Sequence, residues 1–143
     1  MPKSDVKVVI KLSSAPGEAG LGFPLILTGK QSTAVAYTEC SSLDDVEKLF
    51  KSDTAVYKAA NLIFMQSTPP EKIAVCGSTD TALDAIKAIK DKDWRQLIVV
   101  GLDSDTETTA ASIATYIETT DKMYFTSASS KDGMPEITGM DRT

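Results

Sequence analysis

The pair Gly29-Lys30 is the part of the sequence that comes nearest to a phosphate-binding loop. Such a loop has a glycine five residues before the Gly-Lys pair and a serine or threonine directly after it, whereas Pro24 and Gln31 hold those positions here. The residues between Pro24 and Gly29 are strongly apolar and predict a strand, whose N–H groups would not wrap a phosphate. We therefore interpret Gly29-Lys30 as a turn that ends a strand, and we predict no nucleotide site there.

Two aspartates, Asp103 and Asp105, follow the segment 96–101, which we expect to be a parallel strand. Sheets of α/β proteins bind ligands beyond the carboxyl ends of their strands, and two such carboxylates can hold Mg²⁺. The segment 77–80, which follows the preceding expected strand, supplies Ser78 but no matching pair of acids. The favoured interpretation is that Asp105 caps the next helix and Asp103 tightens the turn. We therefore predict no metal or cofactor.

The remaining reactive side chains form no catalytic group. The chain contains no histidine, which excludes Ser-His-Asp and Cys-His catalysis and histidine-ligated metals. Cys40 and Cys76 lack a CxxC partner, so we expect reduced, buried thiols. We expect Trp94 in a helix–strand turn as a lid over the core, and one of Tyr124 and Phe125 inside with the other outside. The sequence therefore predicts no catalytic or cofactor-binding residues, and a protein that is not an enzyme.

Composition limits the classes of partner. The chain has 143 residues, of which 42% are hydrophobic and 24% charged, and its formal net charge is −5. These values are typical of one globular domain. No segment approaches the roughly 20 consecutive apolar residues that a membrane span needs. An acidic chain does not attract nucleic-acid phosphate. We therefore expect neither a membrane nor a nucleic acid as partner.

The negative charge is concentrated in residues 79–121, which hold nine acidic and four basic side chains. Acids and bases balance in the rest of the chain. The favoured interpretation is that the acids lie on the solvated outer faces of two helices. A surface that meets a basic partner is the alternative, and the sequence does not separate the two.

The spacing of apolar residues predicts the elements that must position these side chains. A Gly- and Pro-containing loop is expected over 13–22, and Ser42 is expected to cap the first helix. The helix over 55–66 carries two apolar stripes, so we predict burial on both flanks, within the domain or by a partner. In chain order we expect strands over 6–12, 24–29 and 34–39, helices over 42–50 and 55–66, and strands over 72–77, 96–101 and 122–126 separated by helices over 79–92 and 106–119.

The alternation of strand and helix after residue 72 predicts parallel strands joined by right-handed crossovers. The predicted fold class is therefore α/β, a mixed sheet with a parallel βαβαβ half and helices on both faces. We divide the chain into an N-terminal strand or arm and loop over 1–22, an α/β core domain over 23–126, and a polar C-terminal tail over 127–143, where a longer protein could be truncated. The strand over 6–12 is expected either to pair within its own domain or to complete the sheet edge of a neighbouring subunit.

Several short patterns between residues 42 and 75 carry a resemblance to a known family. They are Ser42–Phe50, which ends in Leu-Phe; Tyr57–Ala60, which reads Tyr-x-Ala-Ala; Phe64–Gln66, which reads Phe-x-Gln; and Pro69–Val75, in which two prolines precede Lys-Ile-x-Val. With the glycine-rich approach over 20–24, this order resembles the tail sheath proteins of contractile bacteriophages, prophages and phage-tail-like bacteriocins. The resemblance extends over residues 20–103.

This resemblance implies a structural function. Sheath subunits polymerise helically around the tail tube and contract, so the implied partners are other sheath subunits and tail tube proteins. The implied location is the virion, after assembly in the bacterial host cytoplasm. Family members are generally longer, so the chain would be an N-terminal portion, and the isolated chain a monomer or small oligomer. The alternative from the residues themselves is a small-molecule-binding, flavodoxin-like α/β module with its site near Ser78 and Asp103.

Overall fold

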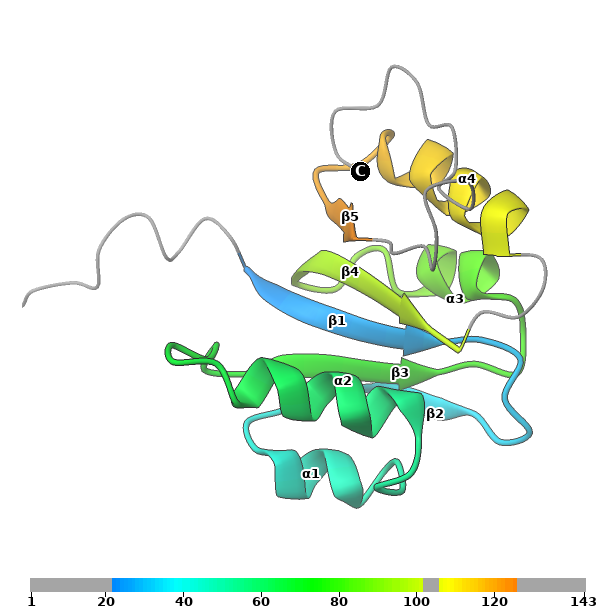
Figure 1. Ribbon diagram of the computed structural model, residues 1–143. Coiled ribbons are helices and arrows are strands. Elements are labelled where there is room, and N and C mark those ends of the chain that lie inside the picture. Colours follow the sequence, from blue (N-terminus) through cyan, green and yellow to red (C-terminus); the bar gives the residue numbers. More distant parts are fainter. Residues whose placement is uncertain (1–21, 102–105, 126–143) are drawn as a thin grey trace, which may run out of the picture.

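The protein was analysed as a computed structural model, which describes residues 22–101 and 106–125, and the side chains of all of these except residues 106–109. The expected strand over 6–12, Asp103, Asp105 and the tail over 127–143 lie outside the described residues. The described elements are β1 (Phe23–Thr28), β2 (Val35–Cys40), α1 (Leu43–Glu47), α2 (Ala55–Phe64), β3 (Ile73–Gly77), α3 (Ala82–Ala88), β4 (Trp94–Val100), α4 (Thr106–Ile117) and β5 (Met123–Phe125) (Figure 1).

The strands form one sheet in the order β2-β3-β1-β4-β5. Strand β1 pairs in parallel with both β3 and β4, and β4 pairs in parallel with β5. Only β2 runs antiparallel, against β3. The predicted class, an α/β protein with a mixed and mostly parallel sheet, is thereby confirmed. The parallel half also contains a feature that local patterns do not encode, since β1 lies between β3 and β4.

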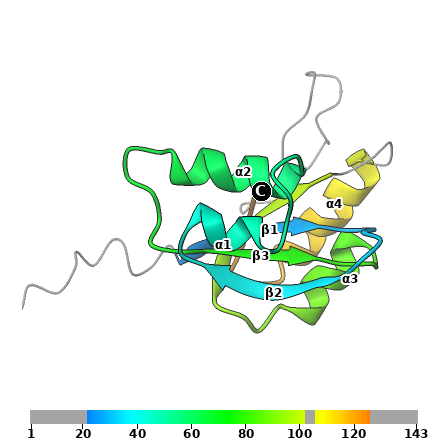
Figure 2. The same cartoon turned by 90° about the horizontal axis from the view of Figure 1, so that it is seen from below.

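Helices cover both faces of this sheet. Helices α1 and α2 lie on one side of the strands, and α3 lies on the other (Figure 2). Helix α4 packs with α3 and with β5, and its buried residues belong to the same cluster as those of α3. Among the described residues no helix is both long and apolar enough to cross a membrane.

Alternate residues of β1 supply two separate hydrophobic cores. Leu25 and Leu27 belong to the cluster under α3 and α4, whereas Ile26 belongs to the cluster under α1 and α2. All three side chains are fully buried. A strand buried on both faces must be apolar at nearly every position, which explains the continuous apolar segment that the sequence shows here.

The helices begin at side-chain caps. The hydroxyl oxygens of Ser42, Thr54 and Thr81 accept hydrogen bonds from backbone N–H groups three residues further along. The predicted cap at Ser42 is therefore confirmed. All four described helices are shorter than expected, and the largest differences are that α1 ends at Glu47 and that α3 covers only Ala82–Ala88.

Trp94 is the clearest local correction. The sequence placed it in a helix–strand turn as a lid, but it is the first residue of β4 and is fully buried. Its indole N–H donates to the carbonyl oxygen of Ile89 at 2.8 Å. Lys122 lies over the indole ring, with Nζ 4.2 Å from the centroid. Lys122, which is distant in the sequence, thus covers one side of the indole ring and helps to bury Trp94.

Lys122 is itself only 6% exposed, and its side chain connects two segments of the chain by hydrogen bonds. Its Nζ donates to the carbonyl oxygens of Lys92 at 2.9 Å and of Trp94 at 2.8 Å. Burial lowers the pKa of Lys122 below its ordinary value, and the nearby Asp121 carboxylate opposes that shift. The ammonium group therefore joins the start of β5 to the turn that precedes β4.

We predict that Lys122→Ala lowers the free energy of unfolding by about 1–3 kcal/mol, because the two carbonyl oxygens lose a charged donor in a buried place. Lys90→Ala, at an exposed position, is the matched control and should change it by less than about 0.5 kcal/mol. Urea denaturation measures both. Equal stability of the two variants would show that the Lys122 contacts do not hold β5.

Tyr37 on β2 carries a buried hydroxyl group that has no hydrogen-bond partner among the described residues. Burial, and next the carboxylates of Glu39 and Asp93, raise the pKa of Tyr37 to about 12. The folded protein therefore holds this proton at a pH where the unfolded chain, with a pKa of 10.0, has released it.

Since the pKa is raised on folding, the contribution of Tyr37 to stability is complete below pH 10 and is lost as the pH rises to about 12. We predict that Tyr37→Phe is at least as stable as the wild type at pH 7, because no hydrogen bond is lost. The variant should lose less stability than the wild type over that alkaline window. Denaturant titrations at several pH values test this, with Tyr57→Phe as control; parallel wild-type and Tyr37→Phe curves would contradict it.

Candidate functional site: a groove beside helix α2

At the carboxyl ends of the parallel strands, backbone hydrogen bonds join the segment after β1 to the segment after β3. The Lys30 N–H donates to the Asp80 carbonyl at 2.8 Å, and the Gln31 N–H donates to the Ser78 carbonyl at 2.8 Å. The Gln31 side-chain amide donates to Thr28 Oγ1 at 3.1 Å. Gly29-Lys30 directly follows the end of β1, and Lys30 has a left-handed φ of 53°. The segment is thus a turn after a strand, and the Lys30 N–H is already bonded.

Of the two residues named for the small-molecule alternative, the structure describes only Ser78. Ser78 follows β3, and its Oγ accepts from the Asp80 N–H at 3.0 Å. Asp103 lies outside the described residues. It follows β4, and β1 separates β3 from β4, so the two strand ends stand roughly 10 Å apart. In the described part of the chain, no three His, Cys, Asp or Glu residues gather as metal ligands would.

The two thiols and the aromatic pair lie as the sequence predicted. Cys40 and Cys76 are free and buried, and burial raises the pKa of each thiol. Tyr124 is 2% exposed and Phe125 is 51% exposed. The raised pKa values keep both cysteines as neutral thiols, which are poor nucleophiles.

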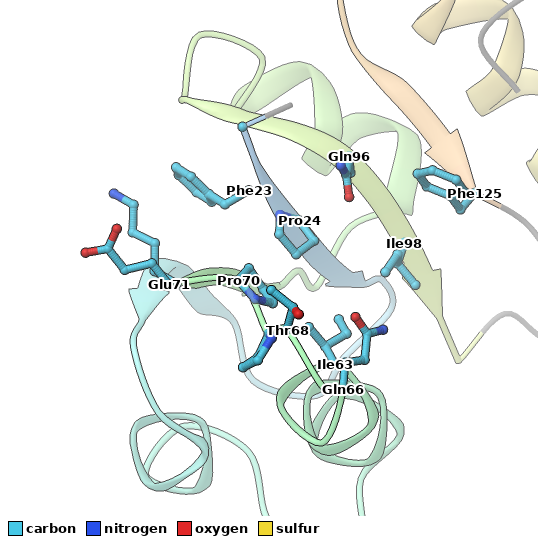
Figure 3. Close-up of a pocket in the computed structure, with 13 residues that line it drawn as sticks. Phe23, Pro24, Ile63, Gln66, Thr68, Pro70, Glu71, Gln96, Ile98 and Phe125 are labelled. Atoms are coloured by element: carbon cyan, nitrogen blue, oxygen red, sulfur yellow. The ribbon is translucent and has the colours of Figure 1, made fainter. Parts of the chain in front are cut away.

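An open groove of about 960 Å³ lies on the sheet face that carries α2. Side chains from β1, β4 and β5 form one side of it, and the end of α2 with the segment before β3 forms the other (Figure 3). The lining residues are Gly22, Phe23, Pro24, Ile63, Gln66, Thr68, Pro69, Pro70, Glu71, Lys72, Gln96, Ile98 and Phe125.

The groove exists because α1 and α2 cover only part of their sheet face. Helix α1 packs against α2 and β2, and α2 packs against α1, β1 and part of β4. The outer strands β4 and β5 therefore keep accessible surface on this face. Gln96 and Ile98 are half-buried, while Met123 and Phe125 are 43% and 51% exposed.

The chemistry of the groove suits a polypeptide segment better than a reaction. Its one lysine, Lys72, already pairs with Glu39 at 2.6 Å and lies over the Phe23 ring at 4.5 Å. The half-buried Gln96 side chain makes no hydrogen bond within the described residues. The lining combines apolar side chains such as Ile63 and Phe125 with the polar side chains of Gln66, Thr68, Glu71 and Gln96. Such a mixture matches a peptide backbone and its side chains.

Helix α2 differs from its predicted environment. Both of its apolar stripes were expected to be buried, but only one is: Val56 is 2% and Ala60 0% exposed. The outward side carries Leu62 and Met65, which are 70% and 72% exposed. Within the described chain only the first stripe is buried, because no other described element packs on the outer side. Burial of that side by a partner, the other half of the prediction, stays a prediction.

Comparison with known proteins adds no relative: no family model matches the chain, and no curated protein matches it. The function is therefore inferred from the sequence and from the geometry described above. Sequence reasoning missed the groove, although one signal was present, since Gln96 is a polar residue at the start of an otherwise apolar strand segment.

Gly22 fixes the way in which the chain enters β1 at the mouth of the groove. Its φ is +61°, and a Cβ there would overlap the Arg95 side chain. Arg95 forms an ion pair with Asp121. The hydrogen bond that the Arg95 guanidinium donates in this pair lowers the pKa of the Asp121 carboxyl.

We predict that Gly22→Ala costs about 1–2 kcal/mol of stability for the left-handed backbone alone, and more because Arg95 must move. In an Arg95→Ala background only the backbone cost should remain, which urea titration of the double-mutant cycle measures. Arg95→Ala alone should cost less than about 1 kcal/mol, since its ion pair is exposed. A neutral Gly22→Ala variant would contradict the described entrance to β1.

Proposed function

We propose that the protein is a structural assembly subunit, the N-terminal portion of a contractile tail sheath subunit. The observation that carries this proposal is the exposed apolar side of α2. Ala55, Lys58, Leu62 and Met65 are all exposed, and their spacing places them on one side of the helix. Three of these four side chains are apolar, which is unusual for a helix surface that meets only water.

The positions that carry the family resemblance support a packing role. Several apolar members of these patterns, among them Val46, Phe50, Ala60, Ile73 and Val75, belong to one core cluster. The patterns shared with sheath proteins therefore describe how α1, α2 and β3 pack together. A resemblance of this kind supports a common architecture, and it includes no group that would perform catalysis.

The occupant that we propose for the outer side of α2 is a neighbouring copy of the subunit. Burying a leucine or methionine side chain contributes roughly 1.5–3 kcal/mol, so Leu62 and Met65 give an interface a strong apolar centre. The opposite side of α2 packs on the sheet, so the contact would be made by a rigid element. If it joins two different surfaces, and the rotation between neighbours does not close a ring, such a contact builds a helical filament.

Assembly of this kind agrees with the roles that the resemblance implies. The subunits would surround tail tube proteins in the virion, after assembly in the bacterial host cytoplasm. The acidic stretch over 79–121 includes α3 and α4, on the sheet face opposite α2. Those helices would then lie away from the α2 contact, where their acids would be solvated.

We predict that the double variant Leu62→Glu/Met65→Glu abolishes ordered polymers of the protein expressed from its complete reading frame. The thermal unfolding midpoint should remain within a few degrees of the wild type, because both side chains are already exposed. Leu49→Glu, on a side chain that is 36% exposed outside this surface, is the matched control and should polymerise. Negative-stain electron microscopy reports polymers, and circular dichroism reports folding.

For the isolated residues 1–143, light scattering after size-exclusion chromatography should show a monomer or small oligomer. Two outcomes would contradict the proposal. One is a complete product that stays monomeric at every concentration tested. The other is polymers that form equally well from the double variant.

A further inference from the structure

We infer that the groove beside α2 is the docking site of residues Val6–Leu12 of the same molecule. The groove leaves apolar surface uncovered at β5, where its lining residue Phe125 is 51% exposed. It also leaves the half-buried Gln96 amide without a hydrogen bond in the described part of the chain. An extended segment docked in the groove would cover this apolar surface. Its backbone would supply a hydrogen-bond partner for the Gln96 amide.

The connectivity of the chain favours this segment. Gly22 and Phe23 line the groove, so the residues before them join the described structure at its mouth. The linker from Leu12 to Gly22 can span up to roughly 33 Å when extended. From β1 to β5 the sheet is only two strand spacings wide, roughly 10 Å. Residues 6–12 can therefore reach every part of the groove without leaving their own molecule.

The side chains of this segment also fit the walls. Val6, Val8, Ile10 and Leu12 alternate with Lys7, Val9 and Lys11, so an extended chain presents four aliphatic side chains on one side. The walls offer Pro24, Ile63, Pro70, Ile98 and Phe125. Apolar alternation against an apolar wall fixes which side of the segment is buried.

The competing segment is residues 126–143, which follow Phe125 and so also leave the described structure at the groove. That segment is polar, contains glycine and has no alternating apolar pattern. It offers the groove fewer aliphatic side chains at a regular spacing than Val6–Leu12 does. A second copy of the chain could supply the same Val6–Leu12 segment, and the experiment distinguishes that case.

This inference does not depend on the proposed function. The surface that we assign to assembly is the outer side of α2, with Leu62 and Met65, whereas the groove lies beside β4 and β5. Docking within one molecule can therefore hold even if no polymer forms, and assembly can hold even if the groove is filled by another segment.

Site-directed photocrosslinking tests the inference. Phe125 is replaced by the photocrosslinking amino acid benzoylphenylalanine in a mixture of ¹⁴N- and ¹⁵N-labelled full chains. We expect crosslinks from position 125 to residues 6–12 in peptides of a single isotope, which means one molecule. Leu49 replaced in the same way is the control, and it should not crosslink to residues 6–12.

Variants in the segment provide the second readout. Val8→Asp or Ile10→Asp should reduce the crosslink yield at least fivefold, whereas Lys7→Asp, on the opposite side of the extended segment, should retain most of it. Circular dichroism checks that each variant is folded. Mixed-isotope crosslinks, crosslinks only to residues 126–143, no crosslink from position 125, or a yield insensitive to Val8→Asp would each overturn the inference.

Discussion

Strand β1 is the element on which the rest of the structure depends. It lies in the middle of the sheet, pairs in parallel with β3 and β4, and is buried on both faces, with Leu25, Ile26 and Leu27 fully buried. Together with its neighbour β3, which supplies Ala74 and Cys76 to one cluster and Ile73 and Val75 to the other, β1 joins the two hydrophobic cores. Because β1 lies between β3 and β4, the carboxyl ends of those two strands are held apart, and the loops after β1 and β3 form backbone hydrogen bonds with each other.

The two faces of the sheet are covered unequally, and both proposed interaction surfaces follow from this inequality. On one face α3 and α4 pack over the central and outer strands, with Ile86, Ile113 and Ile117 fully buried. On the other face α1 has five residues and α2 has ten, and they leave β4 and β5 partly open. The open part is the groove, and the outer side of α2 remains apolar and exposed. The chain thus has one surface suited to an extended segment and another suited to a rigid partner.

Much of the fold could be predicted from the sequence, because apolar periodicity reports local structure directly. Alternating or continuous apolar segments of the sequence predicted every described strand, and Ser42 was predicted to cap the first helix. What the pattern could not give was spatial order. Nothing local to β3 or β4 indicates that β1 lies between them, and nothing in α2 indicates which apolar stripe meets the sheet. Trp94 was misplaced because Lys122, far along the chain, completes its cover. The groove was missed for the same reason, since its walls come from four separate elements.

The central claim is that the outer side of α2 becomes buried when the subunit assembles. Hydroxyl-radical footprinting of assembled and dissociated protein, with methionine oxidation read by mass spectrometry, tests this directly. Met65 is 72% exposed in the described subunit, and Met123, in the opening beside β5, is 43% exposed. We expect assembly to reduce the oxidation of Met65 several-fold, while the oxidation of Met123 changes little. Equal oxidation of Met65 in both samples would contradict it.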